Sequence, residues 1–108
     1  MKKITVFLFF SFPFLLFAQN KMLDSLLKEA DKNVHDSIKM HTLNEIGFIY
    51  EENNPAKAID YFERVNKMAL ALNKPLVVAN SDYDLGFTYL LLGNYENSLQ
   101  HYLQSART

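Results

Sequence analysis

Three histidines and two pairs of acidic residues are the side chains whose types and spacing could do chemistry in this sequence. His41 and Glu45 lie four residues apart, a spacing that places two potential metal ligands on one face of a helix. Two ligands without a third are a weak signal for a metal, so we interpret them as a solvated pair. We expect ordinary surface positions for His35 and His101. The sequence therefore predicts no metal site.

The acidic pairs Glu51-Glu52 and Asp82 with Asp84 could suggest acid–base catalysis. Neighbours on a helix point in diverging directions, and residues two apart do not face each other, so we expect these carboxylates to be solvated. The absence of cysteine excludes thiolate nucleophiles, disulfides and cysteine-based metal sites. The sequence also lacks a Gly-rich phosphate loop, a Gly-x-Ser-x-Gly elbow and a zincin motif. We predict a non-catalytic protein without a cofactor.

The composition indicates one small domain without an electrostatic surface for polyanions. The chain has 108 residues, with 11 Lys and Arg against 12 Asp and Glu, and a formal net charge of −1. Proteins that bind nucleic acid or an anionic membrane carry a clustered basic excess. Nucleic acid is therefore not an expected partner.

The first eighteen residues have the pattern of a secretory signal. Lys2 and Lys3 precede an apolar run over residues 4–17, and the small residue Ala18 follows it. As a helix, this run would rise about 21 Å, which is less than the roughly 30 Å of a membrane core. We predict a signal peptide over 1–18 that is cleaved after Ala18, membrane contact only during export, and a periplasmic or secreted protein. A short uncleaved anchor is the alternative, because Leu16 stands two residues before Ala18.

Beyond this segment, apolar residues recur three and four positions apart, which is the period of amphipathic helices, and no segment alternates as a strand would. The pattern predicts a leading helix within residues 19–36, followed by two helical hairpins. Asp36 or Ser37 is expected to cap the second helix. Loops this short force sequential helices to pack antiparallel. We expect the turns at residues 53–55, 73–75 and 93–94.

An internal repeat relates the two hairpins at a spacing of 39 residues (86 − 47). Leu43-x-x-Ile46-Gly47-x-x-Tyr50 lies over Asp82-x-x-Leu85-Gly86-x-x-Tyr89, and Ala58-x-x-x-Phe62 lies over Ser98-x-x-x-Tyr102. The pattern resembles the tetratricopeptide repeat. Both copies lack the first aromatic residue of that pattern, Ser98 stands where Ala is usual, and the spacing exceeds the standard ~34 residues. The first copy also has a turn that is one residue shorter.

The resemblance implies an all-α fold in which antiparallel helical hairpins stack as a short, right-handed α-solenoid of the tetratricopeptide type. Residues 19–36 would form the leading, capping helix, residues 37–75 the first repeat and residues 76–108 the second. The resemblance also implies which residues pack the repeats together: Gly47, Tyr50, Ala58, Phe62, Leu85, Gly86, Tyr89 and Tyr102.

In this family the first helix of each hairpin lines a concave groove that holds a partner. The expected groove contains no Lys or Arg, so it lacks a basic clamp for a peptide carboxylate. Its aromatic residues suggest an apolar surface, and its Asn side chains can bond a peptide main chain. Contact of those aromatics with a neighbouring helix or a missing repeat is the alternative. The implied groove residues are His41, Asn44, Phe48 and Glu51 in the first copy and Asn80, Tyr83, Phe87 and Leu90 in the second.

The sequence and the resemblance together favour an exported interaction module that binds a peptide or protein partner and has no chemistry of its own. The alternative is the N-terminal sensory region of a truncated signal-transduction protein of the histidine kinase or transcriptional regulator type. A third hypothesis is a small metal- or ligand-binding protein that uses His41 and Glu45. The face of the last helix around Leu99 and Tyr102 is expected to be uncovered, which suggests a homo-oligomer through the C-terminal helix.

Overall fold

The computed structural model describes residues 18–31 and 35–107, so nearly all of the predicted signal peptide lies outside the described residues. A leading helix spans residues 18–30. No strand occurs in the described ranges, which confirms the all-α prediction. In this part of the chain no helix has the length and apolar character needed to cross a membrane. The four helices that follow are α2 (Asp36–Glu51), α3 (Pro55–Ala71), α4 (Pro75–Leu91) and α5 (Tyr95–Arg107).

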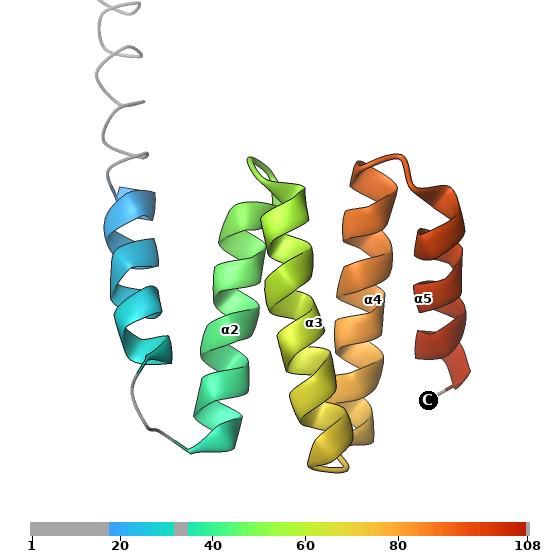
Figure 1. Ribbon diagram of the computed structural model, residues 1–108, viewed down its shortest axis with the longest axis horizontal. Coiled ribbons are helices and arrows are strands. Elements are labelled where there is room, and N and C mark those ends of the chain that lie inside the picture. The colour runs from blue at the N-terminus through green and yellow to red at the C-terminus, as the bar shows by residue number, and fades with distance from the viewer. Residues whose placement is uncertain (1–17, 32–34, 108) are drawn as a thin grey trace, which may run out of the picture.

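Successive helices run in opposite directions and lie side by side in chain order (Figure 1). α2 packs on α3, α3 on α4 and α4 on α5, and the leading helix lies beside α2. The described chain forms a slab with principal extents of 55 × 36 × 18 Å. This arrangement confirms the predicted stack of antiparallel helices, while the right-handed superhelix stays a prediction.

Two of the helices begin with the same asparagine cap. Asn54 Oδ1 accepts a hydrogen bond from the Lys57 backbone N–H at 3.4 Å, and Pro55 occupies the first turn of α3. Asn94 Oδ1 accepts from the Asn97 backbone N–H at 3.3 Å before α5. A capping side chain satisfies one of the N–H groups that the first turn leaves without a partner. The caps lie 40 residues apart and mark corresponding helix starts.

The cap of α2 differs from the prediction of Asp36 or Ser37. The Ser37 backbone N–H donates to His35 Nδ1 at 3.3 Å, and His35 has the extended backbone of an N-cap residue, with φ −55° and ψ 143°. Asp36 is already the first residue of the helix, where its carboxylate faces the positive end of the helix dipole. The prediction was wrong by one or two residues because histidine was not considered as a cap.

The turns explain why the copies match at 39 residues in their first helices and at 40 in their second. After α4, Gly93 has φ +77°, and the Asn94 backbone N–H donates to the Tyr89 carbonyl at 2.9 Å. After α2, no residue takes a left-handed conformation, and the Asn54 backbone N–H donates to the Tyr50 carbonyl at 2.7 Å. The left-handed glycine is the extra residue of the second turn.

The core runs through the hairpins as two neighbouring clusters. Ala58, Phe62 and Leu85 are almost completely buried and join α3 to α4. The other cluster joins α2, α3 and the start of α4, and Leu23, Leu26, Leu27 and Ala30 of the leading helix pack against it. The leading helix therefore covers apolar surface on the first hairpin, as its capping role predicts. The buried members of this cluster are Met40, Leu43, Ile46, Tyr61, Val65, Ala69 and Val78.

Each hairpin is closed by an aromatic ring against a glycine. A Cβ on Gly47 would lie 2.5 Å from Cε1 of Phe62, and a Cβ on Gly86 would lie 2.9 Å from Cδ1 of Tyr102. A Cβ at Gly47 would overlap the ring of Phe62, and a Cβ at Gly86 would require the ring of Tyr102 to shift. The buried Ser98 adds to the second contact, because its hydroxyl donates to the Gly86 carbonyl at 2.7 Å.

A second pair of ring contacts repeats between the copies. The rings of Tyr50 and Tyr61 stack with centroids 5.7 Å apart, and the rings of Tyr89 and His101 stack at 5.5 Å. Tyr50 corresponds to Tyr89 in the first helices, and Tyr61 to His101 in the second helices. The internal repeat is therefore present in side-chain packing as well as in residue types.

The two glycines are expected to respond differently to alanine. Alanine alone would favour either helix by about 1 kcal/mol, but overpacking costs about 1–3 kcal/mol where the neighbour cannot move. Phe62 is fully buried, so we expect Gly47→Ala to lower the free energy of unfolding by about 1–2 kcal/mol. Tyr102 is only partly buried and can shift, so Gly86→Ala should be nearly neutral. Urea unfolding followed by circular dichroism measures both.

A double-mutant cycle isolates the contact in the first hairpin. Phe62→Leu removes the ring atoms that the new methyl group would meet, so it should cost less stability in the Gly47→Ala background than in the natural chain. Equal costs in the two backgrounds, or a Gly47→Ala protein more stable than the natural one, would contradict the ring-on-glycine contact.

Candidate binding groove

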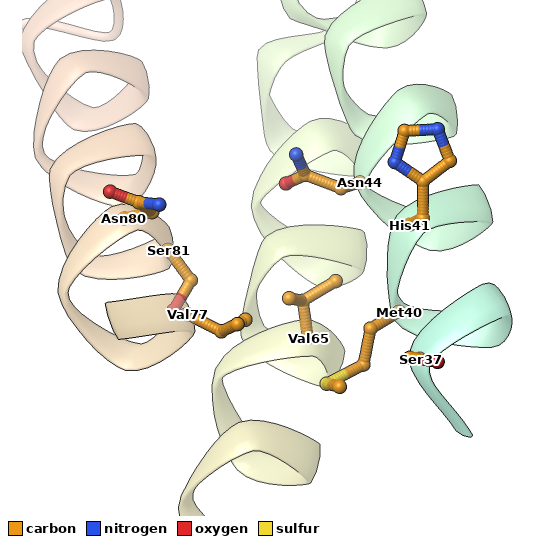
Figure 2. Close-up of a pocket in the computed structure, with 8 residues that line it drawn as sticks. All are labelled: Ser37, Met40, His41, Asn44, Val65, Val77, Asn80 and Ser81. Carbon is orange, nitrogen blue, oxygen red and sulfur yellow. The ribbon is translucent and has the colours of Figure 1, made fainter. Parts of the chain in front are cut away.

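A hollow of about 240 Å³ lies between α2 and α4, with α3 behind it. Val65 of α3 is buried and contributes the apolar floor, and α2 and α4 provide the walls (Figure 2). The two walls come from the first helix of each hairpin, which packing against α3 brings onto the same side. The residues that line the hollow are Ser37, Met40, His41, Asn44, Val65, Val77, Asn80 and Ser81.

Three of the predicted groove residues meet at this hollow. Asn44 of α2 and Asn80 of α4 lie on opposite walls of the hollow (Figure 2). His41 lies at the rim, where its side chain is 74% exposed and its Nε2 lies 3.0 Å from Glu45 Oε1. Within the described residues, no group of three or more His, Asp or Glu side chains is placed to hold a metal.

The predicted aromatic residues are partly exposed, and two of them also pack within their own hairpin. Phe48 is 46% exposed and its ring lies edge-on to Phe62 at 5.2 Å. Tyr83 is 57% exposed and contacts Tyr102 in the same way at 5.4 Å. Phe87 is 38% exposed. Packing and exposure thus coexist: the hairpin supports the rings of Phe48 and Tyr83, and part of each ring remains open to solvent.

The remaining predicted residues lie toward the other end of α2 and α4. Leu90 is exposed. Glu51 is partly buried and accepts a hydrogen bond from Thr88 Oγ1 at 3.1 Å, which links α2 directly to α4. The same hydroxyl lies 2.7 Å from the Asp84 carbonyl of its own helix. A hydroxyl has one proton to donate, so Thr88 cannot fully satisfy both acceptors.

Asp84 belongs to this surface although the sequence analysis placed it in solvent. Burial raises the pKa of the Asp84 carboxyl to about 6, and the negative charge of Glu51 contributes. Burial also raises the pKa of Glu51, as does the charge of Glu52, while the Thr88 hydrogen bond lowers it. The solvated interpretation was wrong because it compared Asp84 only with its sequence neighbours. Asp84 lies four residues after Asn80 and three before Phe87, so helical spacing could have found it.

The expected surface positions of Asp82 and His101 were also wrong. Asp82 is only 5% exposed, and its Oδ1 lies 3.1 Å from His101 Nδ1 across the α4–α5 contact. In the first copy, the corresponding residues are Leu43 and Tyr61, which are both buried in the core. A polar pair therefore replaces an apolar one at the same place in the repeat. Since it holds the second hairpin together, we treat it as structural.

Comparisons with known proteins identify no relative of this chain. No family model matches it, and searches of curated proteins and of solved structures return no match. Interpretation of the groove therefore depends on the internal repeat and on the geometry described above.

Asp84→Asn is expected to stabilise the protein at neutral pH. The folded state raises the pKa of this carboxyl from 3.8 to about 6, so its contribution to stability is greatest below 3.8 and is lost as the pH rises through 6. The neutral amide avoids that loss. Allowing for solvent screening, we expect a gain of about 1 kcal/mol in the free energy of unfolding at about pH 7.5 and none at about pH 4.

The control for this variant is Asp60→Asn, which changes an exposed carboxylate paired with Arg64 at 3.1 Å. Because exposed ion pairs contribute little, this change should leave the pH profile of stability nearly unaltered. Chemical denaturation across the pH range measures both variants. A loss of stability in Asp84→Asn at neutral pH, or a gain that persists in acid, would contradict the buried carboxylate.

The polar pair of the second hairpin should be exchangeable for its apolar counterpart. His101→Tyr alone leaves the Asp82 carboxylate buried without its partner, which costs about 1–3 kcal/mol. The double variant Asp82→Leu/His101→Tyr copies the arrangement of Leu43 and Tyr61 and should recover most of that loss. Thermal unfolding of the two single variants and the double variant measures the coupling, and purely additive effects would argue against structural equivalence of the hairpins.

Proposed function

We propose that this chain is an exported, non-catalytic interaction module that holds a peptide or protein segment in the groove between α2 and α4. The observation that carries the proposal is the position of Asn44 and Asn80 on opposite walls of a hollow with an apolar floor. The tetratricopeptide resemblance supports the same surface, because the first helix of each hairpin lines the partner-binding groove in that family. The signal pattern of residues 1–18 supports export to the periplasm or the exterior.

The side chains of the groove suit a peptide in two ways. An asparagine amide offers two donors and an acceptor, so Asn44 and Asn80 can bond both the N–H and the C=O groups of a peptide backbone. Beside them, Phe48 and Phe87 expose apolar ring surface that a peptide side chain can cover. Backbone contacts would supply affinity and the rings would select side chains.

The C-terminal helix favours a second, compatible role in assembly. Leu99 and Leu103 of α5 are 59% and 46% exposed. In the first hairpin, the residue that corresponds to Leu99 is Ile59, which packs against the core shared with α4. The open face of α5 is therefore of a kind that another helix covers elsewhere in the same chain. This supports a homo-oligomer through α5, or the alternative in which the chain is the sensory part of a signal-transduction protein.

Binding in the groove is tested with peptides selected from a random phage-displayed library on protein purified after expression of the full chain. We expect NMR shift changes on peptide addition to concentrate at Asn44, Asn80 and Phe87. The double variant Asn44→Ala/Asn80→Ala should weaken binding by at least about tenfold, because central interface residues contribute most of the affinity.

The control variant for this experiment is Asn53→Ala, an exposed asparagine in the turn between α2 and α3. It should bind the selected peptides like the natural chain. Peptides whose shift changes map to α5, or that bind the Asn44→Ala/Asn80→Ala protein unchanged, would overturn the groove as the binding site.

A further inference from the structure

Charge is divided unequally between the helices that line the groove and the helices that pair with them. α2 and α4 together carry five acidic residues and one lysine, whereas α3 and α5 carry three acidic and four basic residues. The overall charge is close to zero, so this division is not visible in the composition. The groove side of the repeat is thus the acidic side.

Two of these carboxylates, Glu51 of α2 and Asp84 of α4, lie near each other, outside the residues that line the hollow. Thr88, one turn after Asp84 on α4, donates to Glu51 at 3.1 Å, and the charge of Glu51 helps to raise the pKa of Asp84. Within the described ranges, neither carboxylate forms an ion pair with Lys or Arg. Two like charges that are partly withdrawn from water gain stability when a cation is placed between them.

Two of the three basic residues of the neighbouring helix α3 make their contacts elsewhere. Lys57 Nζ lies 5.0 Å from the ring centroid of Tyr50. Arg64 pairs with Asp60 at 3.1 Å and lies 4.9 Å from the ring centroid of Tyr61. These contacts place both cations on aromatic rings of the first hairpin. A cation for Glu51 and Asp84 must therefore be sought outside the described contacts.

The aromatic residues beside the carboxylates suit the stem of a long basic side chain. Phe87 lies three residues after Asp84 on α4, and Phe48 lies three residues before Glu51 on α2, so each carboxylate shares a helix face with an exposed ring. Burial raises the pKa of Tyr102, and Tyr83 and Glu51 raise it further, so the Tyr102 ring, which packs on Tyr83 at 5.4 Å, also lies within reach of the Glu51 charge. Aromatic rings bind Lys and Arg through both the apolar stem and the cation.

From the exposed rings, the asparagines of the hollow and the neighbouring carboxylates together, we infer that the surface formed by α2 and α4 binds a basic peptide segment, with a Lys or Arg side chain beside Glu51 and Asp84. This inference rests on the proposed function, since it names the partner that the same groove selects. An acidic peptide would bring a third negative charge to the site and be rejected. The partner is thus a protein segment that combines a basic residue with an apolar one.

The test uses three fluorescent peptides of equal length in which a phenylalanine is flanked by lysine, by glutamine or by glutamate. Fluorescence anisotropy with protein from the full chain measures their affinities at low and high salt. We expect the lysine peptide to bind at least about tenfold more tightly than the glutamine peptide at low salt, and the glutamate peptide to bind least. Salt should weaken the lysine peptide most.

The decisive variant is Glu51→Gln/Asp84→Asn, whose fold is checked by circular dichroism. It should bind the lysine and glutamine peptides alike. The control Asp60→Asn/Glu96→Gln changes net charge by the same amount on α3 and α5, and it should keep the preference for lysine. If Glu51→Gln/Asp84→Asn keeps that preference, or if the control loses it, the carboxylates do not select the basic residue and the inference is wrong.

Failure of this inference is distinguishable from failure of the proposed function. If Asn44→Ala/Asn80→Ala weakens all three peptides while lysine brings no advantage, the groove binds peptides but not by charge. If neither double variant affects any peptide, the groove itself is excluded. Calcium alone is the third probe: a rise in melting temperature that Glu51→Gln/Asp84→Asn abolishes, with no preference for the lysine peptide, would assign the carboxylates to a metal ion and overturn the inference.

Discussion

Contact between a glycine and an aromatic ring sets the distance between the two helices of each hairpin. Phe62 lies so close to Gly47, and Tyr102 to Gly86, that a Cβ at either glycine would force the ring to move. Glycine in a helix lowers stability by about 1 kcal/mol relative to alanine, and each hairpin contains one such glycine. The close approach gives the buried ring extensive contact with the opposite helix, which offsets the loss of helix propensity.

This spacing also positions the groove. Because each hairpin closes in the same way, α2 and α4 reach the same side of α3, and the face they share carries Asn44, Asn80 and the carboxylates of Glu51 and Asp84. Asn44 and Asn80 are far apart in the sequence, and so are Glu51 and Asp84. The groove is therefore a consequence of repetition: one hairpin has a single wall, and the second wall arises only when the next hairpin stacks on the first.

Sequence reasoning was accurate where the determining interactions are local. Helix positions follow from the spacing of apolar residues, and the starts of α3 and α5 follow from Asn54 and Asn94, whose caps act within four residues. Equivalence of Gly47 and Gly86 was also visible, since the repeat register is a property of residue types. These features account for the correct all-α architecture and for three of the residues that line the hollow, His41, Asn44 and Asn80.

Errors arose where a residue depends on a partner from another helix. Asp82 and His101 lie 19 residues apart, and each is an ordinary surface residue type when considered alone. The repeat register did contain a signal, because Asp82 falls on the buried Leu43 of the first copy. An acidic residue at a core position needs a buried partner, and the register points to the residue that corresponds to Tyr61, which is His101.

The two carboxylates of α4, Asp82 and Asp84, differ in a way that separates a structural role from a functional one. Asp82 has His101 beside it, and this polar pair stands where the first hairpin has apolar packing. Within the described residues, no buried side-chain nitrogen or oxygen lacks a hydrogen-bond partner. Asp84 forms no ion pair within the described residues, and burial and the charge of Glu51 raise its pKa, so its carboxylate lowers the stability of the fold at neutral pH. Folding alone would favour an amide or an apolar residue at position 84. A charge that the fold does not need, one helical turn from the exposed ring of Phe87, is the feature from which we propose a partner of opposite charge.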